Sequence, residues 1–145
     1  MFKHILIPTD GSELSNIAIT YGVKFAKEIN AKITGLTVTA PYHIFAVESV
    51  QIADTVEQYS EDMQALAARN LNVVKQAASR VGVEYELVHC VSEHPYAEII
   101  KTAQERSCDI IFQASHGRHG VGALILGSQT QKVITHSKIP VLVFR

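Results

Sequence analysis

Short apolar runs divide the chain at intervals along its whole length. They are rich in Ile, Leu and Val, and in the second and third runs polar residues alternate with apolar ones. Runs of this length and composition predict buried β-strands. The predicted strands cover residues 2–8, 32–38, 81–91, 109–113 and 139–144.

Between these runs, apolar residues recur at spacings of three and four, which predicts helices with one buried face. Asp10 or Ser12 can cap the first helix, which ends at Asn30 and has an apolar face of Leu14, Ile17, Ala18, Tyr21, Phe25 and Ile29. The second covers about residues 55–80, with a buried stripe of Val56, Tyr59, Met63, Leu66, Leu71, Val74 and Ala78. A third begins at residues 94–96, where proline suits a first helical turn, and a fourth covers residues 131–136. Residues 41–53 are predicted to form an irregular loop.

Strands that alternate with helices predict the α/β class. We expect one domain over residues 1–145, with a single open, five-stranded, mostly parallel sheet, helices on both faces and a Rossmann-like order. In such sheets ligands bind beyond the carboxyl ends of the strands, where the strand order reverses. The loops after the first and fourth strands share that edge. Asp10 is therefore expected to lie close to residues 113–130.

Composition adds limits rather than a function. The chain is 47% hydrophobic and 19% charged, with a net charge of −1. This balance gives no bulk attraction to nucleic acid or to an anionic membrane. Because no signal peptide or membrane span is evident, we expect a cytoplasmic protein. Cys90 and Cys108 fall at opposite ends of parallel strands, so we expect both to be reduced.

A glycine-rich segment at residues 113–130 is the strongest candidate for chemistry. It follows a predicted strand, precedes a predicted helix and holds half of the eight glycines. Glycines let main-chain N–H groups approach a ligand, and a helix N-terminus adds unpaired N–H donors and a partial positive charge. Together they form an anion site, most often for phosphate. The spacing alone equally allows a surface loop whose glycines only make turns.

The spacing of these glycines also resembles the G-x-x-G-x9-G-[ST] motif of the nucleotide-binding subgroup of the universal stress protein family. Gly117, Gly127 and Ser128 match it, and Ala114 stands at the first glycine. Residues 5–12 resemble the family's first strand and acidic turn, and residues 139–143 resemble its last strand. The resemblance implies an adenine nucleotide α-hydrolase-like fold and a stress-response module that binds ATP or AMP.

The resemblance also implies a set of nucleotide contacts. Asp10 would approach the ribose or a phosphate-bound Mg²⁺, and Val38 would lie beside the adenine. Each has a structural alternative, since Asp10 and Ser128 could only cap helices and Val38 could be core. The implied nucleotide-binding residues are Pro8, Thr9, Asp10, Val38, Gln113, Ala114, Gly117, Arg118, His119, Gly127, Ser128 and Gln129. Gly127→Glu is expected to abolish nucleotide binding and leave the fold intact.

Other functions have less support in the sequence. His116 and His119 lack a third ligand nearby, which disfavours a zinc site, and Asp10 is the only carboxylate expected near the nucleotide. No nucleophile–base pair is evident, so we expect at most weak ATP hydrolysis. The alternatives are a slow ATPase and a dimeric adaptor or chaperone-like stress protein without nucleotide. A receiver domain is disfavoured because no aspartate ends the third strand.

The resemblance finally implies a homodimer. The last predicted strand is short and apolar, and an exposed edge of this kind invites aggregation unless it is covered. Pairing with the same strand of a second copy would cover it. The residues of this expected dimer strand are Val141, Leu142, Val143 and Phe144.

Overall fold

Strands and helices alternate along the chain as the sequence predicts. The computed structural model describes residues 1–42, 55–117 and 125–145. Within this part the order is β1 (His4–Pro8), α1 (Glu13–Ile29), β2 (Lys32–Thr39), α3 (Val56–Val81), β3 (Tyr85–Val91), α4 (Pro95–Glu105), β4 (Ile110–Ala114), α5 (Ser128–His136) and β5 (Val141–Phe144). Most of the loop expected at residues 41–53 lies outside the described residues.

The strands form one parallel sheet in the order β3-β2-β1-β4-β5. β1 pairs with β2 on one side and with β4 on the other, for example Ile5 with both Ile33 and Ile110. The chain thus builds the sheet outward from β1 in one direction and then in the other. This reversal opens a crevice at the carboxyl ends of β1 and β4. The predicted α/β fold is confirmed.

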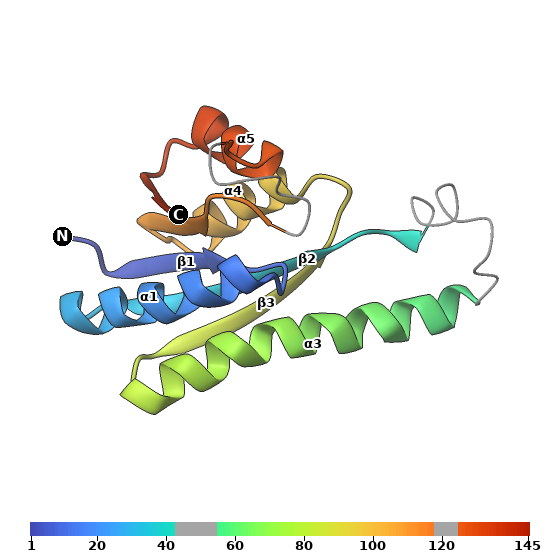
Figure 1. The fold of residues 1–145 in the computed structure, drawn as a ribbon, viewed down its shortest axis with the longest axis horizontal. Coiled ribbons are helices and arrows are strands. Elements are labelled where there is room, and N and C mark those ends of the chain that lie inside the picture. The colour runs from blue at the N-terminus through green and yellow to red at the C-terminus, as the bar shows by residue number, and fades with distance from the viewer. Residues whose placement is uncertain (43–54, 118–124) are drawn as a thin grey trace.

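Helices cover both faces of the sheet (Figure 1). Ile5 and Ile7 of β1 pack with residues of α1 and α3, whereas Leu6 packs with residues of α4 and α5. These three β1 side chains are fully buried. Burying each contributes about 2 kcal/mol of hydrophobic stabilisation. A strand covered on both faces must be apolar at successive positions, which explains the unbroken Ile-Leu-Ile run.

Two element boundaries differ from the sequence prediction by three or more residues. The third strand begins at Tyr85 rather than residue 81, because α3 continues to Val81 and Gly82 ends it with a left-handed φ of 69°. The last helix begins at Ser128, three residues before the predicted start. At the first helix, Ser12 rather than Asp10 is the N-cap, and its side chain accepts a hydrogen bond from Ser15 N.

Three side chains predicted to be buried are exposed. Val56 is 60% exposed because it stands in the first turn of α3, which extends past the end of the sheet (Figure 1). Ile17 and Tyr21 of α1 are 41% and 51% exposed. Tyr21 stacks on Phe144 of the edge strand β5, with 4.9 Å between ring centroids. The apolar face of α1 is therefore wider than the part of the helix that packs against the core. Cys90 and Cys108 are both free, as expected.

A polar network lies in the sheet near the amino ends of its strands. His4 is 5% exposed, and its Nε2 lies 2.7 Å from Thr34 Oγ1. Thr34 Oγ1 donates to Glu86 Oε1 at 2.7 Å, and Arg106 donates to Glu86 Oε2 at 2.8 Å. Burial lowers the pKa of His4 below 6.5; nearby Lys32 lowers this pKa further, and Glu86 opposes the shift. Folding therefore favours the neutral imidazole.

This shift makes stability depend on pH. Because the folded chain binds a proton on His4 less readily, the stabilising contribution is complete above about pH 6.5 and is lost as pH falls through the folded pKa. Burial lowers the pKa of His89 in the same direction. We expect the free energy of unfolding to fall between about pH 7.5 and about pH 5.5, by at most about 1.4 kcal/mol per pH unit for each histidine. Urea denaturation at several pH values measures this slope.

His4→Gln keeps a hydrogen-bonding side chain but removes the titration, so the slope should become shallower. The same replacement at His136, which is exposed, is the matched control. An unchanged slope in the His4 variant would show that folding does not oppose protonation of His4.

Candidate functional site

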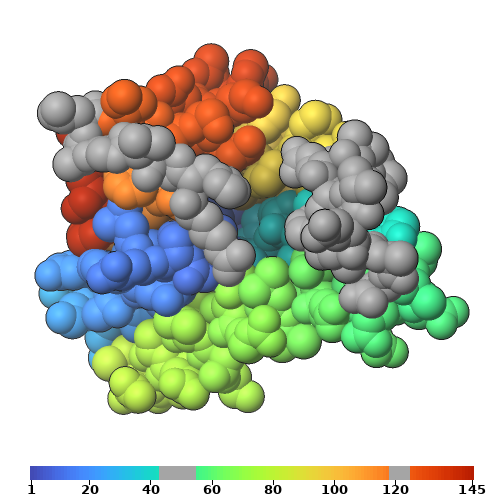
Figure 2. Space-filling model, turned by 45° about the vertical axis from the view of Figure 1, so that its right-hand side comes forward, coloured from blue at the N-terminus to red at the C-terminus, as the bar shows by residue number. Residues whose placement is uncertain are grey.

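A cavity of about 870 Å³ lies at the carboxyl edge of the sheet. It is bordered by α3 on one side and by α4 and α5 on the other, with β2 at its floor (Figure 2). Its size is within the range of about 300–1,000 Å³ that is usual for small-molecule sites. This is the crevice that the reversal of strand order at β1 and β4 creates.

Ten of the twelve sequence-predicted site residues line this cavity. They are Pro8, Thr9, Asp10, Val38, Gln113, Ala114, Gly117, Gly127, Ser128 and Gln129. Arg118 and His119 lie outside the described residues. Segments that are about 100 residues apart in the sequence therefore share one wall.

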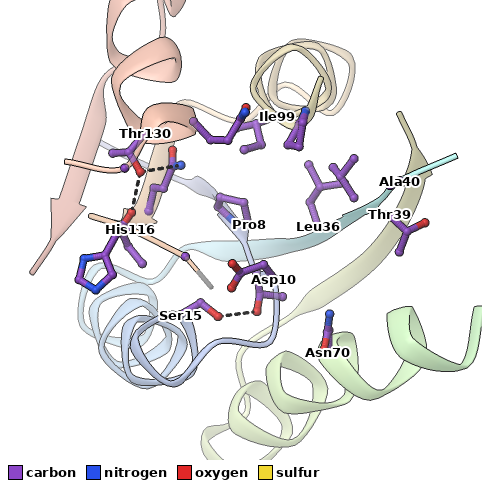
Figure 3. A pocket seen from close by; sticks show the side chains of 18 of the residues that line it. Pro8, Asp10, Ser15, Leu36, Thr39, Ala40, Asn70, Ile99, His116 and Thr130 are labelled. Atoms are coloured by element: carbon purple, nitrogen blue, oxygen red, sulfur yellow. Dashed lines mark hydrogen bonds between the residues drawn. The ribbon is translucent and has the colours of Figure 1, made fainter. Parts of the chain in front are cut away.

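The turn after β1 is held by its own side chains. Thr9 Oγ1 accepts from Gly11 N at 3.2 Å and lies 3.0 Å from Ser15 Oγ. Gly11 has a φ of 78°, which a residue with a side chain rarely adopts. Asp10 Oδ1 accepts from Ser12 N at 3.0 Å. These bonds fix the Asp10 carboxylate at the cavity, where Figure 3 shows it beside Pro8.

The glycine-rich segment at residues 113–130, called the glycine loop below, meets this turn as expected. A Cβ on Gly117 would overlap Asp10 Oδ2, so the two loops touch through backbone and carboxylate. Gly127 closes the far end of the loop, since its N–H donates to Ser115 O at 2.8 Å. A Cβ on Gly127 would stand 3.1 Å from His116 Cα. Any side chain at Gly127 presses on the His116 backbone, so Gly127→Glu is expected to lower stability in addition to its expected effect on nucleotide binding.

The N-terminus of α5 faces the cavity with Ser128, Gln129 and Thr130. Gly127 is the N-cap and supplies no side-chain bond, so Ser128 is not a cap. The N–H groups of the first helical turn have no acceptor within the helix. With the helix dipole they form a local anion site.

Gln129 has a structural task as well. Its Oε1 accepts from Tyr96 N at 3.0 Å, just after Pro95 at the start of α4. This bond ties the first turns of α4 and α5 together, and both turns line the cavity. Nothing in the local sequence around Gln129 indicates a partner 33 residues away.

Gln113 and Ala114 end β4 at the cavity. Gln113 Nε2 donates to Thr130 Oγ1 at 3.3 Å, and that hydroxyl donates to Ala114 O at 3.0 Å. Gln113 Oε1 is buried and has no hydrogen-bond partner in the described part of the chain. The Ala114 methyl belongs to the core cluster that packs on α1 and α3. The missing first glycine of the motif is thus accommodated by the core.

Two walls of the cavity differ in character. Leu36, Val38, Pro95 and Ile99 give an apolar wall on the α4 side. On the other side, one face of α3 contributes residues at spacings of four, three and four, namely Tyr59, Met63, Leu66 and Asn70. The sequence predicted the first three as core residues and did not single out Asn70. A polar residue in an apolar stripe was the available signal.

Among the described residues that line the cavity, two carry carboxylates and none is a lysine or an arginine. Glu93 lines the cavity together with Asp10, so the expectation of a single nearby carboxylate is wrong. Residues 1–42, 55–117 and 125–145 contain no group of three or more His, Cys, Asp or Glu side chains placed to hold a metal ion. A cation here would need ligands from a bound molecule.

An open parallel sheet with a glycine loop and a helix N-terminus at the switch point defines the class of α/β proteins whose ligand sites lie at this edge. The model of the universal stress protein family matches residues 1–145, and the chain belongs to that family. None of the helices described here is long and apolar enough to span a membrane.

Individual relatives agree with this assignment. Universal stress protein MJ0577 of Methanocaldococcus jannaschii is 29% identical over 162 residues, covering 100% of this chain and 96% of its own. Its solved structure superposes with a TM-score of 0.82 at 31% identity, covering 99% of this chain and 95% of that one.

Two further solved structures share the fold. A universal stress protein in complex with cAMP has a TM-score of 0.70 at 21% identity, covering 99% of this chain and 97% of that one. The universal stress protein from Archaeoglobus fulgidus in complex with dAMP has a TM-score of 0.69 at 17% identity, covering 100% and 98%.

The packing of Gly127 gives a test of the loop. We expect Gly127→Ala to lower the free energy of unfolding by about 1–2 kcal/mol, because the added methyl must displace the His116 backbone. Ser128→Ala, one residue further on, is the matched control and should change stability much less. Chemical denaturation measures both, and a Gly127→Ala variant as stable as the parent would contradict the close packing of the loop ends.

Proposed function

We propose that this protein is a cytoplasmic stress-response or signalling module that binds an adenine nucleotide, ATP or AMP, in the cavity at the carboxyl ends of β1 and β4. One observation carries the proposal. A single cavity brings together a helix N-terminus, a fixed carboxylate and an apolar wall, which suit a phosphate, a sugar and a base respectively.

The phosphates belong at the first turn of α5. Ser128 adds a hydroxyl to the unpaired N–H groups there, and Gly117 and Gly127 let backbone approach closely. Asp10 and Glu93 would repel an anion placed directly against them, so the phosphates lie on the α5 side of the cavity. Mg²⁺ is proposed only as a companion of the phosphates, with Asp10 as the protein carboxylate nearest the loop.

The base belongs against the α4 wall. Pro8, Val38 and Ile99 offer flat or branched apolar surface without charge, which suits an aromatic ring. The cAMP and dAMP complexes of two proteins with this fold support an adenine nucleotide as the ligand class. The buried Ala114 methyl, which lies in the core, supports nucleotide binding over the adaptor alternative.

Titration calorimetry with ATP, AMP and GTP, each with and without Mg²⁺, tests this proposal. Mass spectrometry of the denatured protein should also identify any nucleotide that copurifies with it. Micromolar binding of ATP or AMP, with GTP weaker, is the expected result. If calorimetry shows no binding of ATP or AMP and mass spectrometry finds no copurified adenine nucleotide, the proposal is overturned and the adaptor alternative is favoured. Phosphate release by the ATP complex tests the slow-ATPase alternative.

Ser128 offers a sharper test than Gly127. A glutamate at the first position of α5 is favourable for the helix dipole, so Ser128→Glu should keep or slightly raise stability. Its charge would repel the phosphates and weaken ATP binding by more than about tenfold, or about 1.4 kcal/mol. Ser128→Gln, similar in size but neutral, should bind much better. Equal affinities of the two variants would remove the start of α5 from the phosphate site.

We also propose that the protein is a homodimer through β5. Among the described strands, β5 pairs with β4 alone, and its four residues are each partly exposed. Pro140 O accepts a hydrogen bond from Ile111 N of β4, and Phe144 O accepts one from Ser115 N just after β4. In a parallel strand the alternate residues, Val141 and Val143, then turn their backbone groups outward. A second copy could pair there, with Tyr21 and Phe144 beside the contact.

Val143→Pro tests this interface, because it removes an outward N–H and leaves the β4 bonds in place. We expect the variant to be monomeric by sedimentation analysis where the parent is a dimer. Val143→Thr retains the N–H and a branched side chain, and should remain dimeric. A monomeric parent protein would refute the proposed β5 interface.

A further inference from the structure

One buried amide in the cavity has no counterpart among the expected nucleotide contacts. Asn70 of α3 is only 7% exposed and lines the cavity. The other cavity residues on its helix face, Tyr59, Met63 and Leu66, are largely apolar. Burying an amide costs free energy unless its polar atoms find partners. Each polar atom of the amide therefore needs a hydrogen-bond partner, from the protein, from water or from a ligand.

The amide nitrogen is accounted for by the protein. Thr37 Oγ1 donates its proton to Thr9 O at 2.7 Å, so that hydroxyl can only accept from Asn70. The atom of Asn70 that lies 3.4 Å from it must then be the nitrogen, Nδ2. This assignment leaves the oxygen, Oδ1, as the remaining polar atom of the side chain.

Oδ1 lies at the turn that carries Asp10. A Cβ on Gly11 would overlap Oδ1, so this oxygen sits directly against the Gly11 backbone. The described residues donate no hydrogen bond to it. Figure 3 shows Asn70 reaching from α3 into the space that Asp10 borders from the end of β1. The cavity thus holds a fixed acceptor on the α3 side of Asp10.

We propose that Asn70 Oδ1 accepts a hydrogen bond from a ribose hydroxyl of the bound nucleotide and so selects ribonucleotides over deoxyribonucleotides. This inference rests on the proposed function. With the base on the α4 wall and the phosphates at α5, the sugar that joins them lies over the end of β1, next to Asp10 and Gly11. A hydroxyl is the donor that a nucleotide carries at that point.

Asn70 is therefore a specificity-determining residue rather than a general support. A nucleotide that lacks the contacted hydroxyl loses one hydrogen bond to this oxygen, which corresponds to about fivefold in affinity. A purely structural role of Asn70 in holding the turn would affect all nucleotides equally.

Calorimetric titration of ATP, 2′-deoxy-ATP and 3′-deoxy-ATP separates these roles. The parent protein should bind one of the deoxy analogues about fivefold more weakly than ATP. Asn70→Ala should lose about that factor for ATP and nothing for the same analogue, so that its affinities for the two become equal. Thr37→Val, which removes the partner of Nδ2 but keeps Oδ1, is the matched control and should retain the discrimination.

Asn70→Asp covers the case in which the alanine variant does not fold. Its negative charge should lower the affinity for every nucleotide by repulsion. Because it keeps an acceptor oxygen, the preference for ATP over the deoxy analogue should remain. A parent protein that binds all three nucleotides equally, or an alanine variant that keeps the preference, would overturn the role of Asn70 alone. A parent protein that binds none of them would overturn the proposed function together with this inference.

Discussion

The hydrogen bonding of β1 to strands on both of its sides is the constraint on which the remaining structure depends. Because β2 and β4 both pair with β1, the chain must reverse its direction of sheet building there. The chain leaves β1 and β4 toward opposite faces of the sheet, which opens a crevice at the carboxyl ends of these two strands. Three fully buried apolar side chains, Ile5, Leu6 and Ile7, hold β1 in this central place. The position of the cavity is thus a consequence of core packing.

Contact between two loops turns this crevice into a site. The Asp10 carboxylate rests against Gly117, and the ends of the glycine loop close through Gly127 and Ser115. Both contacts need a glycine because a side chain would not fit. Gly127 has a φ of −59°, so it is not needed there for an unusual backbone conformation. Gln129 then joins α5 to α4. The cavity walls are held by the same residues that would bind a ligand, so binding and local stability are linked.

Sequence periodicity and spacing predict much of this. The five strands, the intervening helices and the convergence of Asp10 with the glycine loop all follow from local patterns and the rule for parallel sheets. The glycine spacing also identifies the family that the whole-chain match confirms. These properties depend on neighbouring residues or on the order of elements, which a sequence displays directly.

Other features are decided only by the assembled fold. Tyr59, Met63 and Leu66 have the spacing of core residues, yet they line the cavity, because this part of α3 borders the crevice at the carboxyl edge of the sheet. Asn70 stands out in the sequence only as a polar residue in an apolar stripe, because its neighbours, Thr37 of β2 and Gly11 in the turn after β1, are distant in the sequence. Ser128 resembles a cap but stands inside the helix. Periodicity tells which side of a helix turns inward, whereas only the tertiary structure decides what that side meets.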